Sequence, residues 1–343
     1  MKGSVIINKY LNADSWRMSL KIILIVMFAV LLEGQSFGYQ EEENLDKLRI
    51  AFTRNQNLDV LTGNGRTVLT LKARQVGGKF EFGFLEADVS PDQSLVVALE
   101  CHNYDPDQGP MDGYCEIVEI PLTNILRPTV QVLYSPFKTE IENEFVQLDA
   151  PAWSADGQKI AFFQGQKNDR YGEIVIIEAK SGEVFKRIPV PYLRGVQANG
   201  NYLRWSRNGK KIFIWATHAK EDKEVTADFN QDIGVIALDS GQVRWLGKWI
   251  SGPEGNHWER QLFDPESIEA VKALRGPKER NIDNLGRVLP LGYSPNERYF
   301  FYYQESSTGP SNFSMGGFIK RYDTFSHIVK SIRTIWWTPY YIE

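Results

Sequence analysis

One short phrase recurs along this chain of 343 residues, and it limits the possible folds more than any other feature. It consists of a serine, a variable residue, Asp or Asn, and then Gly or a substitute for Gly. Four copies stand at 90–93, 154–157, 206–209 and 294–297. These residue types at these places are typical of a tight β-turn. An apolar run follows each copy, so the phrase predicts two antiparallel strands joined by a turn, four times over.

The fourth position of the turn differs between the copies. Gly157 and Gly209 occupy it in two turns, whereas Gln93 and Glu297 occupy it in the other two. A side chain at a position that needs a positive φ costs on the order of 1 kcal/mol. If all four turns share one backbone conformation, Gln93 and Glu297 are therefore strained.

The runs after the turns are continuously apolar rather than alternating, as in "LVVAL" and "RYFFYY". A strand of this kind is covered on both faces, as happens in stacked sheets. Hairpins of the form strand, Ser-Gly turn, strand follow at 172–188 and 232–247, and 57–71 has a similar form. The repeating unit is thus four antiparallel strands in about 40–50 residues, which is typical of a propeller blade. We therefore predict an all-β propeller.

The stretch from Trp153 to Phe162 carries the pattern W-S-x-D-G-x-x-I-x-F, with a strand and a Ser-Gly hairpin after it. This pattern resembles the TolB-type propeller repeat, which is also found in relatives of prolyl oligopeptidase and in oligogalacturonate lyase. The resemblance covers most of the chain after residue 47 and implies a single TolB-like propeller over 45–343. It implies a fold and is nearly silent about activity.

The spacing of the turns predicts six blades of four antiparallel strands. Ser206 and Ser294 are 88 residues apart, about twice the usual spacing, so a blade without a legible turn is expected within 250–289. We expect the last strand, around Trp337, to pair into the first blade and close the ring, because an open edge is a liability. An open stack or a five-bladed ring is the alternative.

The expected fifth blade contains a segment that is typical of a short helix. In "DPESIEAVKALRG", Asp264 is a possible N-cap, Pro265 stands at the first helical position, and Gly276 follows the predicted end. This blade is therefore degenerate or decorated.

The N-terminus has the pattern of a signal peptide. Lys21 precedes an apolar run over 22–32, and small residues lead to a cleavage site after Gly38. The run is shorter than the roughly 20 residues of a membrane span. We expect residues 1–38 to be removed, with Met18 as a possible true start, and the mature protein to be periplasmic or secreted without a stable membrane anchor. An uncleaved anchor or a buried helix is the alternative.

Composition and motifs narrow the function further. The formal net charge is −4, and no run of five basic residues occurs, which argues against nucleic acid as the main ligand. The chain contains no G-x-S-x-G elbow, no H-E-x-x-H helix and no phosphate-binding loop. We therefore expect a monomer that binds rather than catalyses and that needs no cofactor.

Propeller topology places the tight turns on one face and the connections between second and third strands, with the crossings between blades, on the other. On that second face the connections are long: 102–114, 165–172, 217–231 and 305–316, with crossings at 135–149 and 190–201. Their charges sum to about −7, against −4 for the whole chain. Long loops tend to carry function, and concentrated acid attracts a cation or a basic partner. We expect this face to bind a protein partner of basic character; an acidic rim that serves only solubility is the alternative.

The candidate binding residues on this face are His102, Asp105, Asp107, Asp112, Gln166, His218, Asp222 and Asp228. His102 and His218 stand twelve residues after their turn serines, and Gln166 holds the same position in the blade between them. Oligogalacturonate lyase holds a metal with His and Gln side chains on this side, so the resemblance implies a conceivable metal site. Two histidines are too few for one, and we expect no metal. A degenerate oligogalacturonate-lyase-like or other carbohydrate-active propeller is the alternative function.

Two cysteines flank the first long connection. In an exported protein, Cys101 and Cys115 predict a disulfide between neighbouring strands, with two buried thiols as the alternative. The acids between them are not an EF-hand loop, because Pro110 stands where that loop requires Gly.

Overall fold

The computed structural model divides into two compact units, Met1–Asn44 and Leu45–Glu343, and every described strand belongs to the second. The structure describes residues 43–76, 79–104, 114–136, 146–166, 172–190, 193–196, 203–218, 230–250, 257–258, 265–275, 288–305 and 316–336. The predicted signal peptide at 1–38 lies outside the described residues, so its prediction stays untested.

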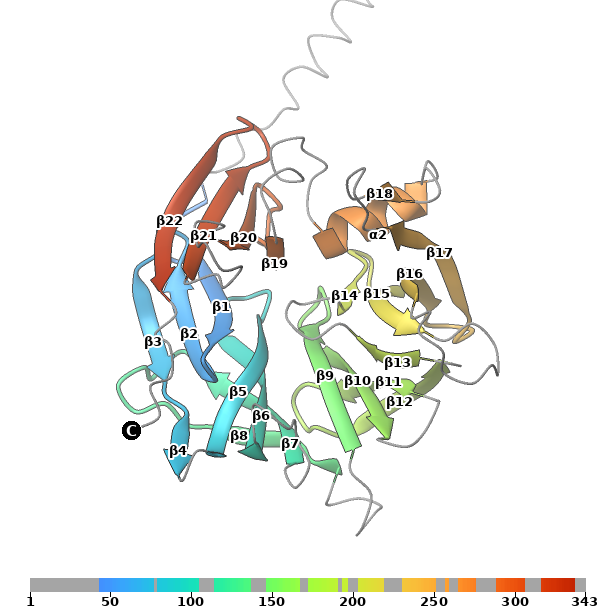
Figure 1. The fold of residues 1–343 in the computed structure, drawn as a ribbon, viewed down its shortest axis with the longest axis horizontal. Helices are drawn as coiled ribbons and strands as arrows, with labels where there is room; N and C mark the ends of the chain where they lie inside the picture. Colours follow the sequence, from blue (N-terminus) through green and yellow to red (C-terminus); the bar gives the residue numbers. More distant parts are fainter. Residues whose placement is uncertain are drawn as a thin grey trace, which may run out of the picture. The chain divides into compact units, whose positions relative to one another are not determined.

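The second unit is an all-β propeller whose described strands form five sheets in a ring (Figure 1). Blade 1 contains β1 (Arg49–Arg54), β2 (Asn57–Thr62) and β3 (Thr67–Leu71), and blade 2 contains β4 (Arg74–Val76), β5 (Lys79–Val89), β6 (Leu95–Tyr104), β7 (Tyr114–Pro121) and β8 (Gln131–Tyr134). Blade 3 contains β9 (Val146–Trp153), β10 (Lys159–Gln166), β11 (Gly172–Glu178) and β12 (Val184–Val190). Blade 4 contains β13 (Leu193–Val196), β14 (Leu203–Trp205), β15 (Lys211–His218), β16 (Asn230–Ala237), β17 (Val243–Ile250) and β18 (His257–Trp258). Blade 5 contains β19 (Val288–Tyr293), β20 (Tyr299–Glu305), β21 (Gly316–Asp323) and β22 (Val329–Trp336). All the recorded strand pairs are antiparallel, with neighbours in chain order in blades 1, 2, 3 and 5.

The recurring serine explains why the turn phrase repeats. In blade 3, Ser154 Oγ donates a hydrogen bond to Asp156 Oδ1 at 2.7 Å and accepts one from the Lys159 amide at 2.9 Å. The same pair of bonds recurs around Ser90, Ser206 and Ser294, and all four serines are buried. Each serine therefore ties the turn to the start of the second strand, which satisfies polar groups that the sheet leaves unpaired.

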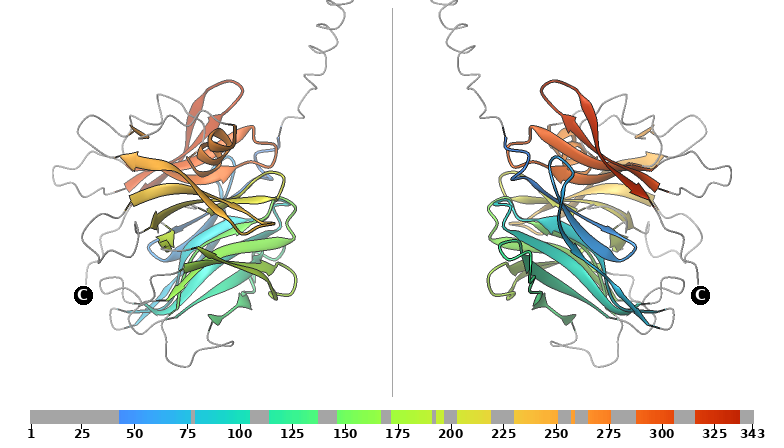
Figure 2. Two further views of the ribbon diagram at one scale, coloured as in Figure 1. Left: turned by 90° about the vertical axis from the view of Figure 1, so that its right-hand side faces the viewer. Right: turned by 90° about the vertical axis from the view of Figure 1, so that its left-hand side faces the viewer.

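The fourth turn position has a positive φ in every copy, as the sequence predicts. Its φ is 68° at Gly157 and 66° at Gly209, and it is 65° at Gln93 and 58° at Glu297. The two turns without glycine therefore hold a side chain in the left-handed region, at a cost of about 1 kcal/mol each. In the side views of Figure 2, the tight turns lie together on one side of the ring, which we call the turn face.

The continuously apolar strands are covered on both sides, also as predicted. In β10, Ile160, Ala161, Phe162 and Phe163 are each at most 1% exposed. Ile160 and Phe162 pack in a cluster with blade 2, and Ala161 and Phe163 pack in a cluster with blade 4. Alternate side chains of one strand thus fill two separate interfaces between blades, and burying each large one contributes about 2 kcal/mol.

Glycines in the outer hairpin turns let neighbouring blades approach each other. Gly182 in blade 3 has a φ of 72°, and a Cβ there would lie 2.1 Å from the Leu133 carbonyl oxygen of blade 2. Gly65 in blade 1, with a φ of 83°, meets the Ile332 carbonyl of blade 5 in the same way at 2.2 Å. Each of these turns presses its backbone onto the outer strand of the neighbouring blade, and only glycine fits.

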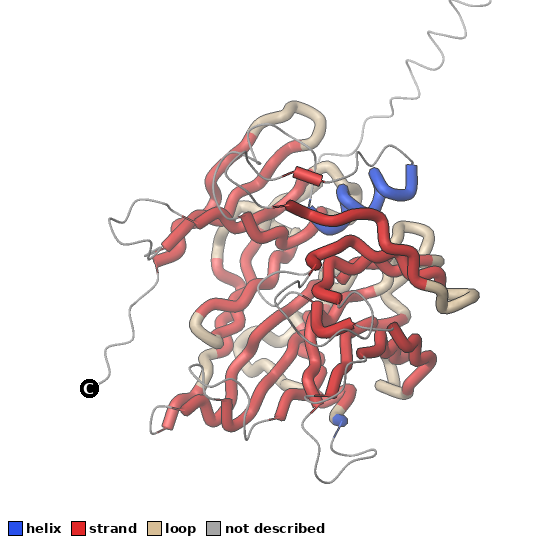
Figure 3. The backbone as a smooth tube through the Cα atoms, turned by 45° about the vertical axis from the view of Figure 1, so that its right-hand side comes forward, coloured by secondary structure: helices blue, strands red, loops and turns tan. Residues whose placement is uncertain are grey.

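The prediction of six blades is not confirmed, because the described residues form five. Within the region expected to hold a further blade stands α2 (Pro265–Arg275), which is the predicted helix (Figure 3). Its Ala270 and Leu274, one turn apart, are fully buried, and it contacts β14, β15, β16 and β19. The 88-residue spacing is thus partly taken up by a helix between blades 4 and 5. No helix among the described residues is both long and apolar enough to cross a membrane.

Closure of the ring by a shared strand is not seen among the described residues. Blade 1 contains three strands there with β1 at its edge, and the predicted closing strand around Trp337 lies outside the described residues. Blades 5 and 1 meet instead through side chains and through the close backbone approach of Gly65 to Ile332. Arg321 donates a hydrogen bond to the Gly63 carbonyl at 3.1 Å, and Leu61 and Ile319 share an apolar cluster.

Candidate functional site

The structure describes three of the eight predicted binding residues, and they stand on three different blades. His102 lies near the end of β6, Gln166 ends β10, and His218 ends β15. Since the second strand of each blade starts at the turn face, these ends lie on the opposite side, which we call the loop face. Asp105, Asp107, Asp112, Asp222 and Asp228 lie outside the described residues, so their predicted role stays a prediction.

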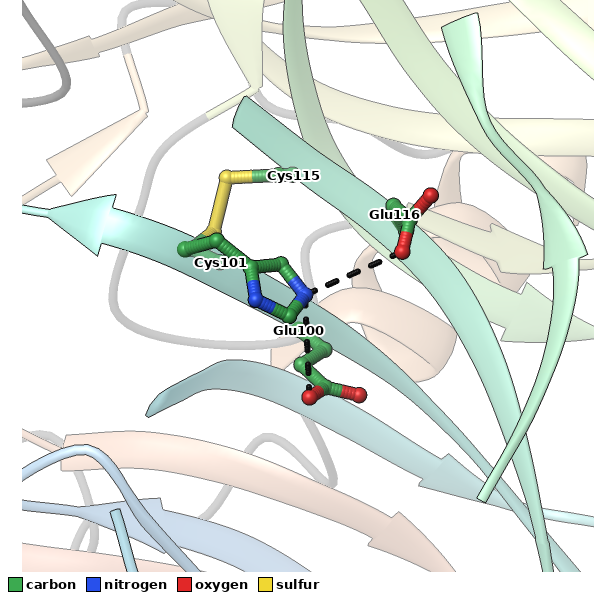
Figure 4. Close-up of a disulfide and its surroundings, with 5 residues drawn as sticks. Glu100, Cys101, Cys115 and Glu116 are labelled. Carbon is green, nitrogen blue, oxygen red and sulfur yellow. Dashed lines mark ion pairs between the residues drawn. A yellow bond between two sulfur atoms is a disulfide. The ribbon is translucent and has the colours of Figure 1, made fainter. Parts of the chain in front are cut away.

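The predicted disulfide is present at this face, between β6 and β7. Cys101 and Cys115 are directly paired across the two strands, with their Cα atoms 4.0 Å apart (Figure 4). Both residues are buried. The bond fixes the two strand ends from which the first long connection departs.

His102 lies between two carboxylates on the opposite side of the same strand pair. Its Nε2 lies 3.7 Å from Glu100 Oε1 and 3.7 Å from Glu116 Oε2, the two ion pairs drawn as dashed lines in Figure 4. The Tyr114 ring stacks on the imidazole, with the ring centroids 4.7 Å apart. Glu100 and Glu116 are paired in register, so their like charges face each other across the strands. The side chains of all three are at most 24% exposed.

Burial dominates the electrostatics of this group. It raises the pKa of Glu100, with repulsion from Glu116 as the second cause, and it lowers the pKa of His102. Burial thus favours the uncharged form of both groups, while Glu116 acts in the opposite direction on His102. Among the residues that the structure describes, no three His, Cys, Asp or Glu side chains converge in a metal-binding arrangement.

A second site, which the sequence reasoning missed, lies at the turn face. A cavity of about 630 Å³ opens among the recurring turns and the strands that precede them. We call it the central cavity. Its lining includes Val89 and Pro91 from blade 2, Trp153 and Ala155 from blade 3, Trp205 and Arg207 from blade 4, Tyr293 and Pro295 from blade 5, Ile50 and Ala51 from β1, and Glu269, Lys272 and Ala273 from α2. The residues just before and just after the repeated serine thus line this cavity in blades 2 to 5.

An ion pair spans the central cavity. Arg204 Nη1 of blade 4 lies 3.0 Å from Asp88 Oδ1 of blade 2, and both side chains are at most 16% exposed. The second Asp88 oxygen accepts a hydrogen bond from the Trp153 amide of blade 3 at 2.9 Å. Arg204 Nη2 also donates to the Leu291 carbonyl of blade 5 at 3.2 Å. Two side chains therefore connect four blades at the centre of the ring.

Two buried donors at the central cavity have no hydrogen-bond partner among the described residues. They are Trp153 Nε1 and Tyr293 Oη. Burial, followed by repulsion from Glu297, raises the pKa of Tyr293, so the phenol keeps its proton. A buried donor without a partner is costly. Both residues line the central cavity, but these two polar atoms are themselves closed off from solvent.

The rim of the central cavity carries both signs of charge. Glu297 lies 2.9 Å from Lys272 of α2 and 4.0 Å from Arg207 of blade 4. Arg49 lines the β1 side, where its guanidinium donates to the carbonyls of Asp46 and Leu48. The lining as a whole thus contains one more basic residue than acidic ones, with Arg49, Arg204, Arg207 and Lys272 against Asp88, Glu269 and Glu297.

One sequence signal pointed to the central cavity. Two residues before the repeated serine stand Asp88, Ala152, Arg204 and Gly292 in blades 2 to 5. At this equivalent position one blade has an acidic residue, one has a basic residue and two have very small residues. This pattern indicates an ion pair across the axis of the ring, with room left by the small residues. Gly292 leaves the room, since a Cβ there would lie 3.3 Å from Arg204 Nη2.

Comparison with known proteins gives distant structural likenesses only. No family model matches the sequence, and no curated protein matches it. Among solved structures, TolB from Acinetobacter baumannii is 13% identical with a TM-score of 0.29, over 82% of this chain and 56% of that one. Oligogalacturonate lyase from Vibrio parahaemolyticus is 11% identical with a TM-score of 0.36, over 83% and 77%. The β-propeller domain of the trilobed protease from Pyrococcus furiosus is 13% identical with a TM-score of 0.34, over 77% and 72%.

These likenesses are distant and concern the fold alone. The chain spans little more than half the length of the TolB structure. TolB-like, prolyl oligopeptidase and oligogalacturonate lyase propellers are thus what this chain resembles in architecture.

Proposed function

We propose that the protein is an exported propeller that binds a protein partner of basic character through its loop face, without catalysis. The observation that carries this proposal is the distribution of charge. The long connections sum to about −7. The predicted signal peptide contributes +2 to the net charge of −4, so the remaining chain carries −6, and its net negative charge lies on these connections. Such a concentration of one sign steers an oppositely charged partner toward one face.

The described part of the loop face supports a rigid base for such binding. The Cys101–Cys115 disulfide and the paired strands β6 and β7 fix both ends of the connection that contains Asp105, Asp107 and Asp112. A binding loop held at a rigid base loses less conformational entropy on association than a free one.

The test is a pull-down from an envelope fraction with the mature protein as bait. We expect the captured protein to be lost with the Asp105→Asn, Asp107→Asn, Asp112→Asn triple variant, and capture to fall as salt is raised. The matched control neutralises Glu183, Asp239 and Glu269, three acids outside the long connections.

Two outcomes contradict the proposal. Equal loss of capture in the control variant means that net charge, rather than this face, governs binding. A stoichiometric metal in the purified protein that disappears in a His102→Ala, His218→Ala variant favours the carbohydrate-active alternative instead.

A further inference from the structure

The central cavity has the size and the apolar lining of a small-molecule site. Its volume of about 630 Å³ falls inside the range of roughly 300–1,000 Å³ for ligand pockets. Ile50, Val89, Trp205, Leu291 and Phe301 supply apolar and aromatic lining. A flat apolar group is therefore suited to its interior.

The polar groups of the cavity are mainly donors with capacity to spare. Arg204 uses two of its five N–H groups, one toward Asp88 and one toward the Leu291 carbonyl. Both Asp88 oxygens already accept hydrogen bonds. Trp153 is 6% exposed, and its Nε1 has no partner among the described residues, like Tyr293 Oη. A ligand that brings acceptors can use the remaining N–H groups of Arg204, whereas one that brings donors cannot.

The charge of the cavity favours an anion. Its lining contains four basic residues (Arg49, Arg204, Arg207 and Lys272) and three acidic ones (Asp88, Glu269 and Glu297), in a chain of net charge −4. Asp88 is occupied by Arg204, and Glu297 is shared by Lys272 and Arg207. Burial and the neighbouring Arg66 lower the pKa of Arg49, while Asp46 acts in the opposite direction.

We propose that the central cavity binds a small amphipathic anion, a flat apolar body that carries one carboxylate. The apolar body lies among Trp205, Leu291 and Phe301. The carboxylate accepts hydrogen bonds from the donors of the cavity and faces its basic rim. This site lies at the turn face and is separate from the loop face proposed to bind a protein.

The first test compares three probes that share one ring system: naphthalene-2-carboxylate, 2-naphthamide and 2-naphthylmethylammonium. Isothermal titration calorimetry on the mature protein measures their affinities. We expect the carboxylate to bind at least tenfold more tightly than the amide, and the ammonium to bind most weakly. Equal affinities for the three probes overturn the proposal, because they indicate nonspecific binding to apolar surface without selection for an anion.

The second test locates the site with matched variants. Ala273→Trp on α2 fills the cavity and is expected to lower carboxylate affinity at least tenfold, whereas Ile268→Trp on the same helix, 55% exposed and outside the lining, leaves it unchanged. Unchanged affinity in Ala273→Trp overturns the proposal even if the carboxylate probe binds more tightly than the amide and the ammonium.

The third test separates this inference from the proposed function and from the chain's own C-terminal segment. Neutralising Asp105, Asp107 and Asp112 is expected to leave naphthalene-2-carboxylate binding unchanged. Removing residues 337–343 is expected to do the same. Loss of binding in either variant overturns the proposal, because the probe then depends on residues outside the central cavity.

Discussion

Arg204 lies 3.0 Å from Asp88 and thereby joins blade 4 to blade 2 across the axis of the ring. The pair is largely shielded from water, and each partner has a further bond to another blade. Breaking such a pair leaves one charge buried without its counter-ion, which costs far more than the loss of a surface pair.

We therefore expect Asp88→Asn and Arg204→Met each to lower the free energy of unfolding by about 2 kcal/mol. The double variant is expected to lose about 1 kcal/mol less than the sum of the two, because both substitutions remove one interaction. Urea unfolding of the four proteins measures this coupling. Strict additivity of the single effects means that the ion pair does not join the blades energetically.

The outer turns provide a graded test of how closely blades pack. Gly182 and Gly65 would each place a Cβ about 2 Å from a carbonyl oxygen of the neighbouring blade, whereas the nearest atom to a Cβ at Gly241 is 3.6 Å away. All three glycines have a positive φ, so alanine costs each of them about 1 kcal/mol for the backbone alone. We expect Gly182→Ala and Gly65→Ala to be several-fold more destabilising than Gly241→Ala in thermal unfolding. Equal losses at the three positions argue against the close approach.

The strained turn at Glu297 predicts that glycine at this position is more stable than an uncharged residue with a side chain. Glu297→Gly relieves the positive φ but also removes the contacts of the side chain with Lys272 and Arg207. Glu297→Gln keeps the backbone strain and removes only the charge, so it is the reference. We expect Glu297→Gly to be more stable than Glu297→Gln by about 1 kcal/mol, and Gly209→Ala to be less stable than wild type by a similar amount. Chemical denaturation gives both differences, and a loss at Glu297→Gly relative to Glu297→Gln contradicts the strain.

Glu100 predicts a pH-dependent difference in stability. Burial and Glu116 raise its pKa in the folded state, so the folded protein binds this proton more tightly than the unfolded chain does. The contribution of this proton to the free energy of unfolding is fully present below the pKa of Glu in the unfolded chain, about 4.3. It is lost as the pH rises through the higher pKa of Glu100 in the folded protein. Glu100→Gln is therefore expected to be more stable than wild type at pH 7, with the advantage fading near pH 4. Melting temperatures of both proteins at pH 7 and pH 4 test this, and Glu183→Gln in an exposed turn is the control. A stabilisation by Glu100→Gln that grows toward pH 4 contradicts the raised pKa of Glu100.

Local chemistry explains why much of the fold was predictable. The serine, the Asp or Asn and the fourth residue of each turn contact one another within six residues, so their pattern is visible in the sequence. The helix from Pro265 and the Cys101–Cys115 bond were predictable for similar reasons, since their signals are a start residue and a short spacing. The strain at Gln93 followed from its alignment with Gly157.

The count of blades and the central cavity depend on long-range geometry instead. An 88-residue interval fits either an additional blade or a decorated crossing, and spacing alone does not distinguish the two. Asp88 and Arg204 are 116 residues apart, and only the curvature of the ring brings them together. The predicted acidic face remains a prediction, because its aspartates lie outside the described residues.

The junction of blades 5 and 1 has a mechanical consequence. Among the described residues no strand crosses it, so separating Leu61 from Ile319 and Arg321 from Gly63 breaks side-chain contacts and leaves every described ladder whole. The other junctions are tethered by the chain itself. The described sheets of blades 5 and 1 can therefore separate while the hydrogen bonds within each sheet stay intact.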